Sequence, residues 1–308
     1  MTATPARPSA PATPSAPAAS SPRVPAGPDA WLILGYAAVA YLATLAVLGY
    51  TFGFLAGLGV PKNIDSGPHL AWPLAVLIDA ALLLLFAVQH TVMARPAFKR
   101  AWTRLVPAPA ERATFVLAAT ASLALLCWQW RPIGGTLWHL TGAGRAVLLA
   151  VNLVGWAVAV SSTVMISHAD LFGLRQAYLH ARGVPYHPPP FTQRGLYGRV
   201  RHPLMTGFVI IFWAAPTMTL GHLLLAAGAT GYILVGISFE ERDLTPQLGA
   251  AYRDYLTRVP ALIPRWGNLG VTPVASVTPV APAGAPAHIP PDHPSGDPGQ
   301  SEPSRPPG

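Results

Sequence analysis

Five apolar stretches, each long enough to cross a lipid bilayer, decide what this chain of 308 residues can fold into. A membrane span needs about 20 consecutive apolar residues, so we expect spanning helices at 31–55, 70–93, 113–130 and 145–166. Charged residues make up only 10% of the chain, whereas a soluble domain carries about a quarter. The sequence therefore predicts an integral membrane protein.

The fifth apolar stretch, 204–239, is too long for a single span. One straight helix of this length would measure about 54 Å, at 1.5 Å per residue. Pro216, Gly221 and His222 lie near its middle, so we expect two shorter helices folded back as a hairpin. The predicted fold is an all-α membrane protein with four spanning helices plus this hairpin, five to six membrane helices in all.

The sequence after the hairpin, "EERDLTPQLGAAYRDYLTRVPALIP", is typical of an amphipathic helix lying on the cytoplasmic side. Leu244, Leu248, Tyr252 and Tyr255 recur at roughly helical spacing, and the prolines in "VPALIP" end the helix. The hairpin predicts that Arg201-His202 at its start and Glu240-Glu241 at its end meet at one edge of the membrane.

The two ends of the chain, 1–30 and 268–308, are rich in Pro, Ala and Ser and contain few bulky apolar side chains. We expect both to be disordered, which leaves 31–267 as one membrane domain. The first apolar stretch is too long for the core of a signal peptide, so we expect it to remain as a helix. The single cysteine, Cys127, lies within an apolar stretch and predicts packing rather than a disulfide or a metal site.

The basic residues cluster in two of the connections, which predicts the orientation of the chain. Arg95, Lys99, Arg100, Arg104 and Arg112 lie between the second and third spans, and five further arginines follow the fourth span. By the positive-inside rule these connections and both termini face the cytoplasm. The net charge of +8 is explained by this topology, and no nucleic-acid partner is expected.

Charged and polar side chains at the helix ends admit two interpretations. The four residues at the ends of the hairpin either anchor it in the lipid headgroups or line a site for a zwitterionic or cationic cofactor. Inside the second span Asp79 and His90 share a helix face, and on the fourth Ser161 and His168 do so. Asp79 is expected either to line a cavity or to be hydrogen-bonded between helices.

Six segments give the sequence a family resemblance. "GLYGRVRHP", "EERDL" and "YRDYLTRVPALIP" resemble the C-terminal signature of the isoprenylcysteine carboxyl methyltransferase superfamily. "AVQHTVMARPAFKRAW", "WQWRP" and "ISHADLFGLRQAYLHARG" resemble the bacterial methanethiol S-methyltransferases, a branch close to the NnrU-like proteins. The resemblance covers about 31–265. The chain departs from the superfamily pattern at Met205, where an aromatic residue is common, and at Leu248-Gly249.

The resemblance implies an S-adenosylmethionine site within about 194–265. Its expected ligands are Tyr197, Arg201, His202, Pro203, Gly207, Glu240 and Glu241. Arg201 or His202 would pair with the methionyl carboxylate, one of the two glutamates would accept from the ribose hydroxyls or the ammonium group, and Gly207 would allow close approach to the backbone. No metal is expected.

The resemblance also implies methylation of methanethiol to dimethyl sulfide in the bacterial inner membrane, with hydrogen sulfide as a second acceptor. His90 and His168 are the candidate bases, and Gln89 and Asp170 the candidate pocket residues. The expected partners are a small volatile thiol and the lipid bilayer, without a known protein partner. The alternatives are methylation of a prenylcysteine carboxylate or a phospholipid, and a non-enzymatic NnrU-like or haem-binding protein, although no C-x-x-C-H motif is present.

Overall fold

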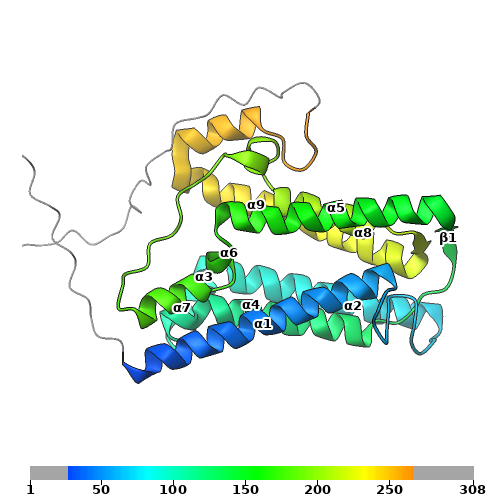
Figure 1. The fold of residues 1–308 in the computed structure, drawn as a ribbon, viewed down its shortest axis with the longest axis horizontal. Coiled ribbons are helices and arrows are strands. Elements are labelled where there is room, and N and C mark those ends of the chain that lie inside the picture. Colours follow the sequence, from blue (N-terminus) through cyan, green and yellow to red (C-terminus); the bar gives the residue numbers. More distant parts are fainter. Residues whose placement is uncertain (1–26, 266–308) are drawn as a thin grey trace, which may run out of the picture.

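The computed structural model describes residues 27–265, and this part of the chain is largely helical (Figure 1). Five of its helices are long and apolar enough to cross a membrane: α1 (Pro28–Ala56), α2 (Trp72–Ala94), α4 (Ala108–Gln129), α5 (Gly142–Ile166) and α9 (Leu220–Arg258). The predicted all-α membrane fold is confirmed. The expected disordered ends lie outside the described residues, except that α1 already begins at Pro28.

The expected hairpin is present. The short helix α8 (Pro203–Trp213) runs away from Arg201-His202, and α9 returns after the short strand β2 (Thr217–Thr219). Thr219 caps the new helix, because its hydroxyl accepts a hydrogen bond from the backbone N–H of His222 at 3.1 Å. The buried His222 ring hydrogen-bonds the carbonyl oxygen of Phe212 at 3.0 Å, which fixes the turn between the two helices.

The expected amphipathic helix is the last part of α9, continuous with the spanning part but set off by a kink. Gly249 has φ 62° and ψ −135° within the helix, a backbone conformation that only glycine adopts at low cost. Beyond it Tyr252 and Tyr255 are buried together with Val259 and pack against Phe191. The helix ends at Arg258, just before the first proline of "VPALIP".

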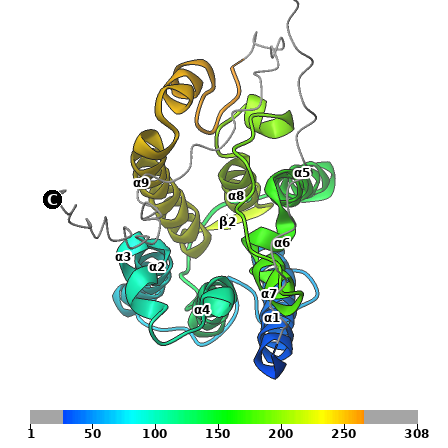
Figure 2. The same cartoon turned by 90° about the vertical axis from the view of Figure 1, so that its left-hand side faces the viewer.

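The helices form two groups that lie side by side along their length (Figures 1 and 2). In the first bundle α4 packs against α1 and α2, with the short helix α7 (Leu174–Ala181) across one end. In the second bundle α8 packs against α5 and α9. Helix α9 also packs against α2, so this contact joins the two bundles. The short helix α3 (Pro96–Trp102) follows α2.

A short sheet closes one end of the molecule, a feature that the sequence did not predict. Strand β1 (Thr136–His139), which links α4 to α5, pairs antiparallel with β2, with Thr136 opposite Thr219. The hydroxyl of Thr219 also donates to the carboxylate of Asp65, in the connection between α1 and α2, at 2.6 Å. The two bundles are therefore tied together at this end, which we call the sheet end.

Asp79 belongs to the sheet end rather than to a cavity near His90. It is fully buried, and its Oδ1 accepts a hydrogen bond from the backbone N–H of Arg131 at 2.8 Å, just after α4 ends. The ammonium group of Lys62 donates to the carbonyl oxygens of Trp128 and Trp130 in the same region. Burial, followed by the nearby charge of Arg131, lowers the pKa of Lys62. These contacts satisfy carbonyl groups that the end of α4 leaves free.

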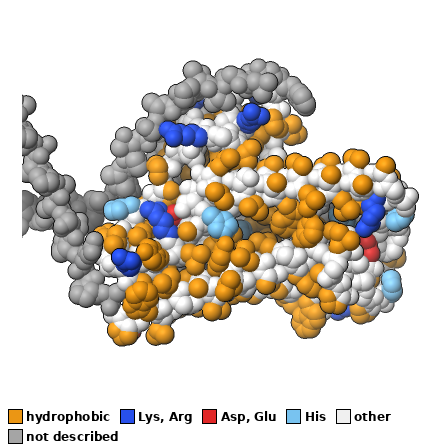
Figure 3. Space-filling view, in the orientation of Figure 1, with side chains coloured by type: hydrophobic (Ala, Val, Ile, Leu, Met, Phe, Trp, Pro, Cys, Tyr) orange, Lys and Arg blue, Asp and Glu red, His pale blue; other side chains and the backbone are white. Residues whose placement is uncertain are grey.

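The outer surface is apolar along the bundles and charged mainly at their ends (Figure 3). Large apolar side chains on α1, α2 and α5 are exposed, such as Leu32, Leu77 and Val164, which are 73%, 65% and 64% exposed. A soluble protein would not leave so many large apolar side chains in water, so these faces contact lipid.

Candidate active site

The four charged residues at the ends of the hairpin meet, as the sequence predicts. The Oε1 atom of Glu241 accepts from Nε of Arg201 at 2.7 Å and lies 3.0 Å from Nε2 of His202. Glu240 approaches the other ring nitrogen of His202 at 3.5 Å. We call these four residues the rim cluster. Glu241 is mostly buried within it, whereas the side chain of Glu240 is 51% exposed.

The backbone of "VPALIP" lies over the start of α8 and holds the rim cluster in place. The N–H groups of Arg201 and His202 donate to the carbonyl oxygens of Pro260 and Ala261, at 2.8 and 3.1 Å. The guanidinium of Arg201 donates to the carbonyl oxygens of Leu256, at 3.2 Å, and Val259. Pro203 occupies the first turn of α8, where its missing N–H costs nothing. Nε and Nη1 of Arg201 are therefore already bonded to Glu241 and the backbone.

Tyr197 lies next to the rim cluster in a short 3₁₀ helix, η1 (Gly195–Gly198). It is buried, its hydroxyl donates to the carbonyl oxygen of Ser162 on α5 at 3.4 Å, and its own carbonyl accepts from the hydroxyl of Tyr255 at 2.6 Å. Burial and the negative charge of Glu240 raise the pKa of Tyr197 to about 12, against the opposing effect of the Ser162 bond. The phenol therefore stays protonated.

Gly207 faces a neighbouring helix. A Cβ atom at this position would meet the carbonyl oxygen of Gly155 at 2.7 Å and the backbone nitrogen of Ala159 at 2.8 Å, both on α5. The lack of a side chain thus permits close packing of α8 on α5. We expected a ligand to approach the backbone at Gly207, but the atoms that face Gly207 belong to α5. Met205, the departure from the superfamily pattern, is partly buried.

His90 sits in an aromatic enclosure formed by three helices. Its ring stacks on Phe86 of α2 with centroids 5.4 Å apart, and lies 4.9 Å from Phe115 of α4 and 6.4 Å from Tyr232 of α9. The Nδ1 atom is buried and has no hydrogen-bond partner among the described residues. We call these four residues the histidine cluster. The adjacent Gln89 instead bonds the sulfur of Met93 at 3.1 Å.

His168 begins the short helix α6 (His168–Leu171), and both of its ring nitrogens are engaged. Nδ1 lies 2.8 Å from the hydroxyl of Thr163, and Nε2 lies 3.0 Å from the hydroxyl of Tyr41 on α1. The expected polar stripe on α5 is wrong at Ser161, which is exposed. The buried hydroxyls belong to Ser162 and Thr163, one and two residues further on.

Asp170 is buried and pairs with Arg175 of α7 at 2.8 Å. Burial alone would raise the pKa of Asp170, but hydrogen bonds from Ser167 and Arg175, together with the positive charge of Arg175, hold it below its usual value. This carboxylate is therefore ionised at neutral pH.

Arg112 lies near both candidate bases. The sequence analysis counted it only among the basic residues that predict the orientation of the chain. The Nε atom of Arg112 donates to the carbonyl oxygen of Leu171 at 2.8 Å, at the end of α6. Its Cζ atom lies 4.9 Å from the centroid of Phe115, the same ring that His90 contacts. Arg112 thus extends between the histidine cluster and the helix that carries His168.

Contacts between α2 and α9 join the histidine cluster to the rim cluster. The hydroxyl of Thr91 donates to that of Tyr232 at 3.3 Å, and Arg95 forms an ion pair with Asp243 at 3.0 Å. The guanidinium of Arg95 also lies over the ring of Phe239, 4.5 Å from its centroid. Both clusters therefore lie at the end opposite the sheet end, on two faces of the same helix.

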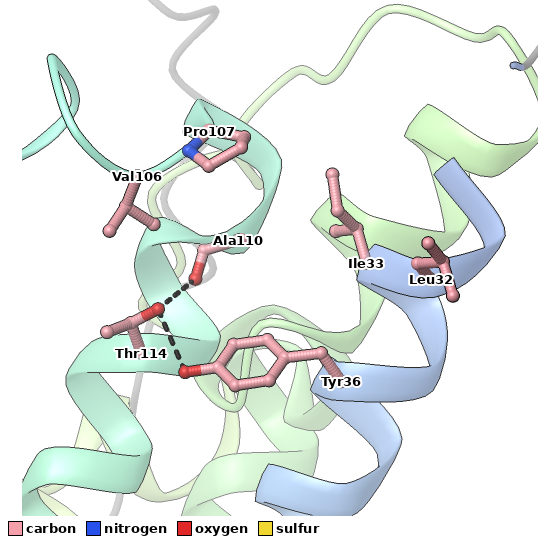
Figure 4. A pocket seen from close by; sticks show the side chains of 7 residues that line it. All are labelled: Leu32, Ile33, Tyr36, Val106, Pro107, Ala110 and Thr114. Carbon is pink, nitrogen blue, oxygen red and sulfur yellow. Dashed lines mark hydrogen bonds between the residues drawn. The ribbon is translucent and has the colours of Figure 1, made fainter. Parts of the chain in front are cut away.

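Neither of two surface hollows involves these clusters. A hollow of about 360 Å³ opens between α1 and α4 (Figure 4), and is lined by Leu32, Ile33, Tyr36, Val106, Pro107, Ala110 and Thr114. A second, of about 190 Å³, lies at the sheet end beside Asp65 and Arg145. Within residues 27–265 no group of three or more His, Cys, Asp or Glu side chains is placed to hold a metal ion.

The part of the chain that matches a known protein family contains the residues of both clusters. The model of the NnrU protein family matches residues 78–263. A protein of Mycobacterium tuberculosis named methanethiol S-methyltransferase is 51% identical over 76% of this chain and 96% of its own length. Methanethiol S-methyltransferase 2 of Bradyrhizobium diazoefficiens is 49% identical over 76% of this chain and 90% of its own length. Nurim of Mus musculus is 30% identical over 62% and 73%. The chain therefore belongs to the NnrU protein family, together with the bacterial proteins named methanethiol S-methyltransferase.

Proposed function

We propose that this protein is a membrane enzyme that transfers a methyl group from S-adenosylmethionine to methanethiol and releases dimethyl sulfide. The observation that carries the proposal is the position of the rim cluster and the histidine cluster at one end of the helices, on two faces of α9. Relatives between 43% and 51% identical carry the name methanethiol S-methyltransferase. One cluster offers fixed charges for a donor, and the other offers a largely apolar environment for a small thiol.

The residues of the rim cluster fit a methyl donor that carries an ammonium group, a carboxylate and a ribose. Glu240 is half exposed and has only a 3.5 Å contact with His202, so it can accept from an ammonium group or from hydroxyls. Nε and Nη1 of Arg201 are bonded to Glu241 and to backbone carbonyls, and both ring nitrogens of His202 face glutamates, which leaves Nη2 of Arg201 to approach the carboxylate. When bound, S-adenosylmethionine supplies a methyl group activated by a sulfonium charge.

The histidine cluster fits the deprotonation of a small thiol. The Nδ1 atom of His90 has no partner among the described residues, so it is free to accept a proton. His168 is the weaker candidate because both of its nitrogens are already hydrogen-bonded. The rings of Phe86, Phe115 and Tyr232 exclude water around His90. Charge is lost when a thiolate reacts with a sulfonium, so a dry site favours the reaction.

The expected orientation completes the proposal. The basic connections lie at the end that carries both clusters, so the positive-inside rule places this end in the cytoplasm of a bacterial inner membrane. A soluble, charged donor would then reach the rim cluster from the cytoplasm. A volatile, apolar thiol would reach the histidine cluster through lipid.

The test is incubation of the purified protein in lipid nanodiscs with methyl-labelled S-adenosylmethionine and single acceptors. The acceptors are methanethiol, hydrogen sulfide, a larger alkyl thiol and farnesylcysteine, and the label is measured in the headspace and in the extracted lipid. We expect labelled dimethyl sulfide from methanethiol. Label only in farnesylcysteine or in phospholipid would instead support the carboxylate or lipid methyltransferase. An absorption spectrum with a Soret band would indicate the haem-binding alternative.

A further inference from the structure

Arg112 is a partly buried arginine whose guanidinium makes one hydrogen bond, from Nε to the carbonyl oxygen of Leu171. Within residues 27–265 it forms no ion pair, although Arg95, Arg175, Arg201 and Arg258 all do. A guanidinium has five N–H donors, so four of them have no partner in the described part of the chain. An anion that accepted from these N–H groups would gain charge-assisted hydrogen bonds, which makes Arg112 a candidate anion site.

An apolar wall lies beside the guanidinium of Arg112. One face of the guanidinium lies over the ring of Phe115, which His90 also contacts. Of the nearby acids, Asp170 pairs with Arg175, whereas Glu111 acts on Arg112 through its charge without forming an ion pair with any described residue. The titratable and charged groups that surround Arg112 are His90 of α2, Glu111 of α4, His168 and Asp170 of α6, Arg175 of α7 and Tyr186 of the following loop.

Anchoring of α6 does not account for Arg112. Gly173, just after α6, has φ 84°, and a Cβ atom there would meet the backbone nitrogen of Ala113 at 2.6 Å. The main chain at Gly173 is thus already in close contact with the main chain of α4 beside Arg112. A single neutral donor would suffice for the carbonyl of Leu171. The charge and the remaining N–H groups are left for a ligand.

We propose that Arg112 binds the sulfur of the acceptor thiol and stabilises it as a thiolate. This inference rests on the proposed function and adds a catalytic residue to it. The S–H bond breaks, and its proton passes to Nδ1 of His90, which holds it through the methyl transfer. The thiolate lone pair forms the new bond to the methyl carbon as the bond from that carbon to the donor sulfonium breaks. The electron pair of that bond stays on the donor sulfur, which becomes a neutral thioether.

The experiment compares Arg112→Gln and Arg112→Lys with the parent protein and with Arg104→Gln. Arg104 is exposed in the same basic connection, so its substitution removes the same charge without touching the site. Methyl transfer to methanethiol is measured in nanodiscs from about pH 6 to pH 9.5, and the affinity for S-adenosylhomocysteine is measured by calorimetry on each variant.

An adjacent arginine lowers a thiol pKa by about one unit or more, so we expect a shift in the pH profile. At pH 7, kcat/KM should fall roughly 10- to 100-fold in Arg112→Gln, and the deficit should shrink as the pH rises and free thiolate accumulates. Arg112→Lys should keep most of the activity, and S-adenosylhomocysteine affinity should be unchanged. A profile for Arg112→Gln parallel to that of Arg104→Gln would overturn the proposal.

The parent protein supplies a second measurement, which does not depend on whether a variant folds. If Arg112 stabilises the bound thiolate, kcat of the parent at saturating thiol should level off about one pH unit or more below the solution pKa of the thiol, because kcat reports ionisation in the complex. A rate that rises in step with free thiolate up to that pKa would refute the inference. Absence of any thiol methylation by the parent would instead refute the proposed function.

Discussion

Glu240 and Glu241 are neighbours in the sequence, but their surroundings differ, so the same substitution is expected to change a different property at each position. Glu241 accepts two hydrogen bonds, from Arg201 at 2.7 Å and from His202 at 3.0 Å. Its side chain is 20% exposed, whereas that of Glu240 is 51% exposed and, among residues 27–265, forms an ion pair only with His202, at 3.5 Å. We therefore expect Glu241→Gln to affect mainly stability, and Glu240→Gln to affect mainly binding of the donor.

The size of the two effects follows from the hydrogen bonds. A bond to a charged group contributes about 1.5–3 kcal/mol and a neutral one about 0.5–1.5 kcal/mol, so neutralising Glu241 should cost about 2–3 kcal/mol over its two bonds. For a chain of this size that corresponds to a fall in Tm of about 4–12 °C. The exposed contact of Glu240 is worth less than about 1 kcal/mol. If Glu240 accepts from the ammonium group or the ribose, its loss should weaken binding about tenfold.

The assay is thermal unfolding of the detergent-solubilised protein, followed by tryptophan fluorescence, with calorimetric titration of S-adenosylhomocysteine on the same samples. Asp254→Asn is the matched control, because Asp254 is exposed on the last part of α9 and pairs only with Arg258 within one helical turn. Equal Tm shifts for the two glutamate variants would refute the assignment of Glu241 to the structure. Unchanged affinity in Glu240→Gln would return Glu240 to a headgroup anchor.

Three further outcomes are expected. Gly207→Ala should lower Tm by several degrees, because its Cβ would lie 2.7 Å from a backbone oxygen of α5 and overpacking costs about 1–3 kcal/mol; Gly231→Ala, which meets open space, should not. The folded-state pKa of Asp170 lies below its unfolded value, so its stabilisation is present above about pH 4 and is lost as the pH falls through the folded value. Asp170→Asn should therefore lower Tm at pH 7 and flatten the acid-induced fall in Tm measured for the parent. Cysteines at the exposed positions Arg199 and Arg242 should react with an impermeant maleimide only from the cytoplasmic side, and labelling from opposite sides would contradict the hairpin orientation.

The membrane helices and the rim cluster could be predicted because each depends on length and hydropathy alone. A stretch from 204 to 239 is too long to span once, so its two ends had to return to the same side. The observed contact of His202 with Glu241 follows from that geometry. The four earlier spans follow from apolar length in the same way.

The acceptor side could not be predicted to the same degree, because its features depend on tertiary packing. A basic residue near the start of a helix has the same appearance in sequence whether it faces headgroups or a neighbouring helix. The bond from Arg112 to Leu171 and the approach of Gly173 to Ala113 show that Arg112, on α4, faces α6. Likewise the rule that puts residues seven apart on one helix face selected Ser161 with His168, but α5 ends at Ile166 and His168 begins α6, and the buried hydroxyls are those of Ser162 and Thr163.

The pairing of β1 with β2 bears on the electrical insulation of the membrane. A protein that takes up a charged molecule from one side risks a leak of protons or ions if an aqueous path forms across it. At the sheet end the two bundles are held together by this pairing and by the bond from Thr219 to Asp65. The carboxyl group of Asp79 is fully buried there, away from the rim cluster. A ligand that binds at the opposite end therefore does not have to break the contacts that hold the sheet end together.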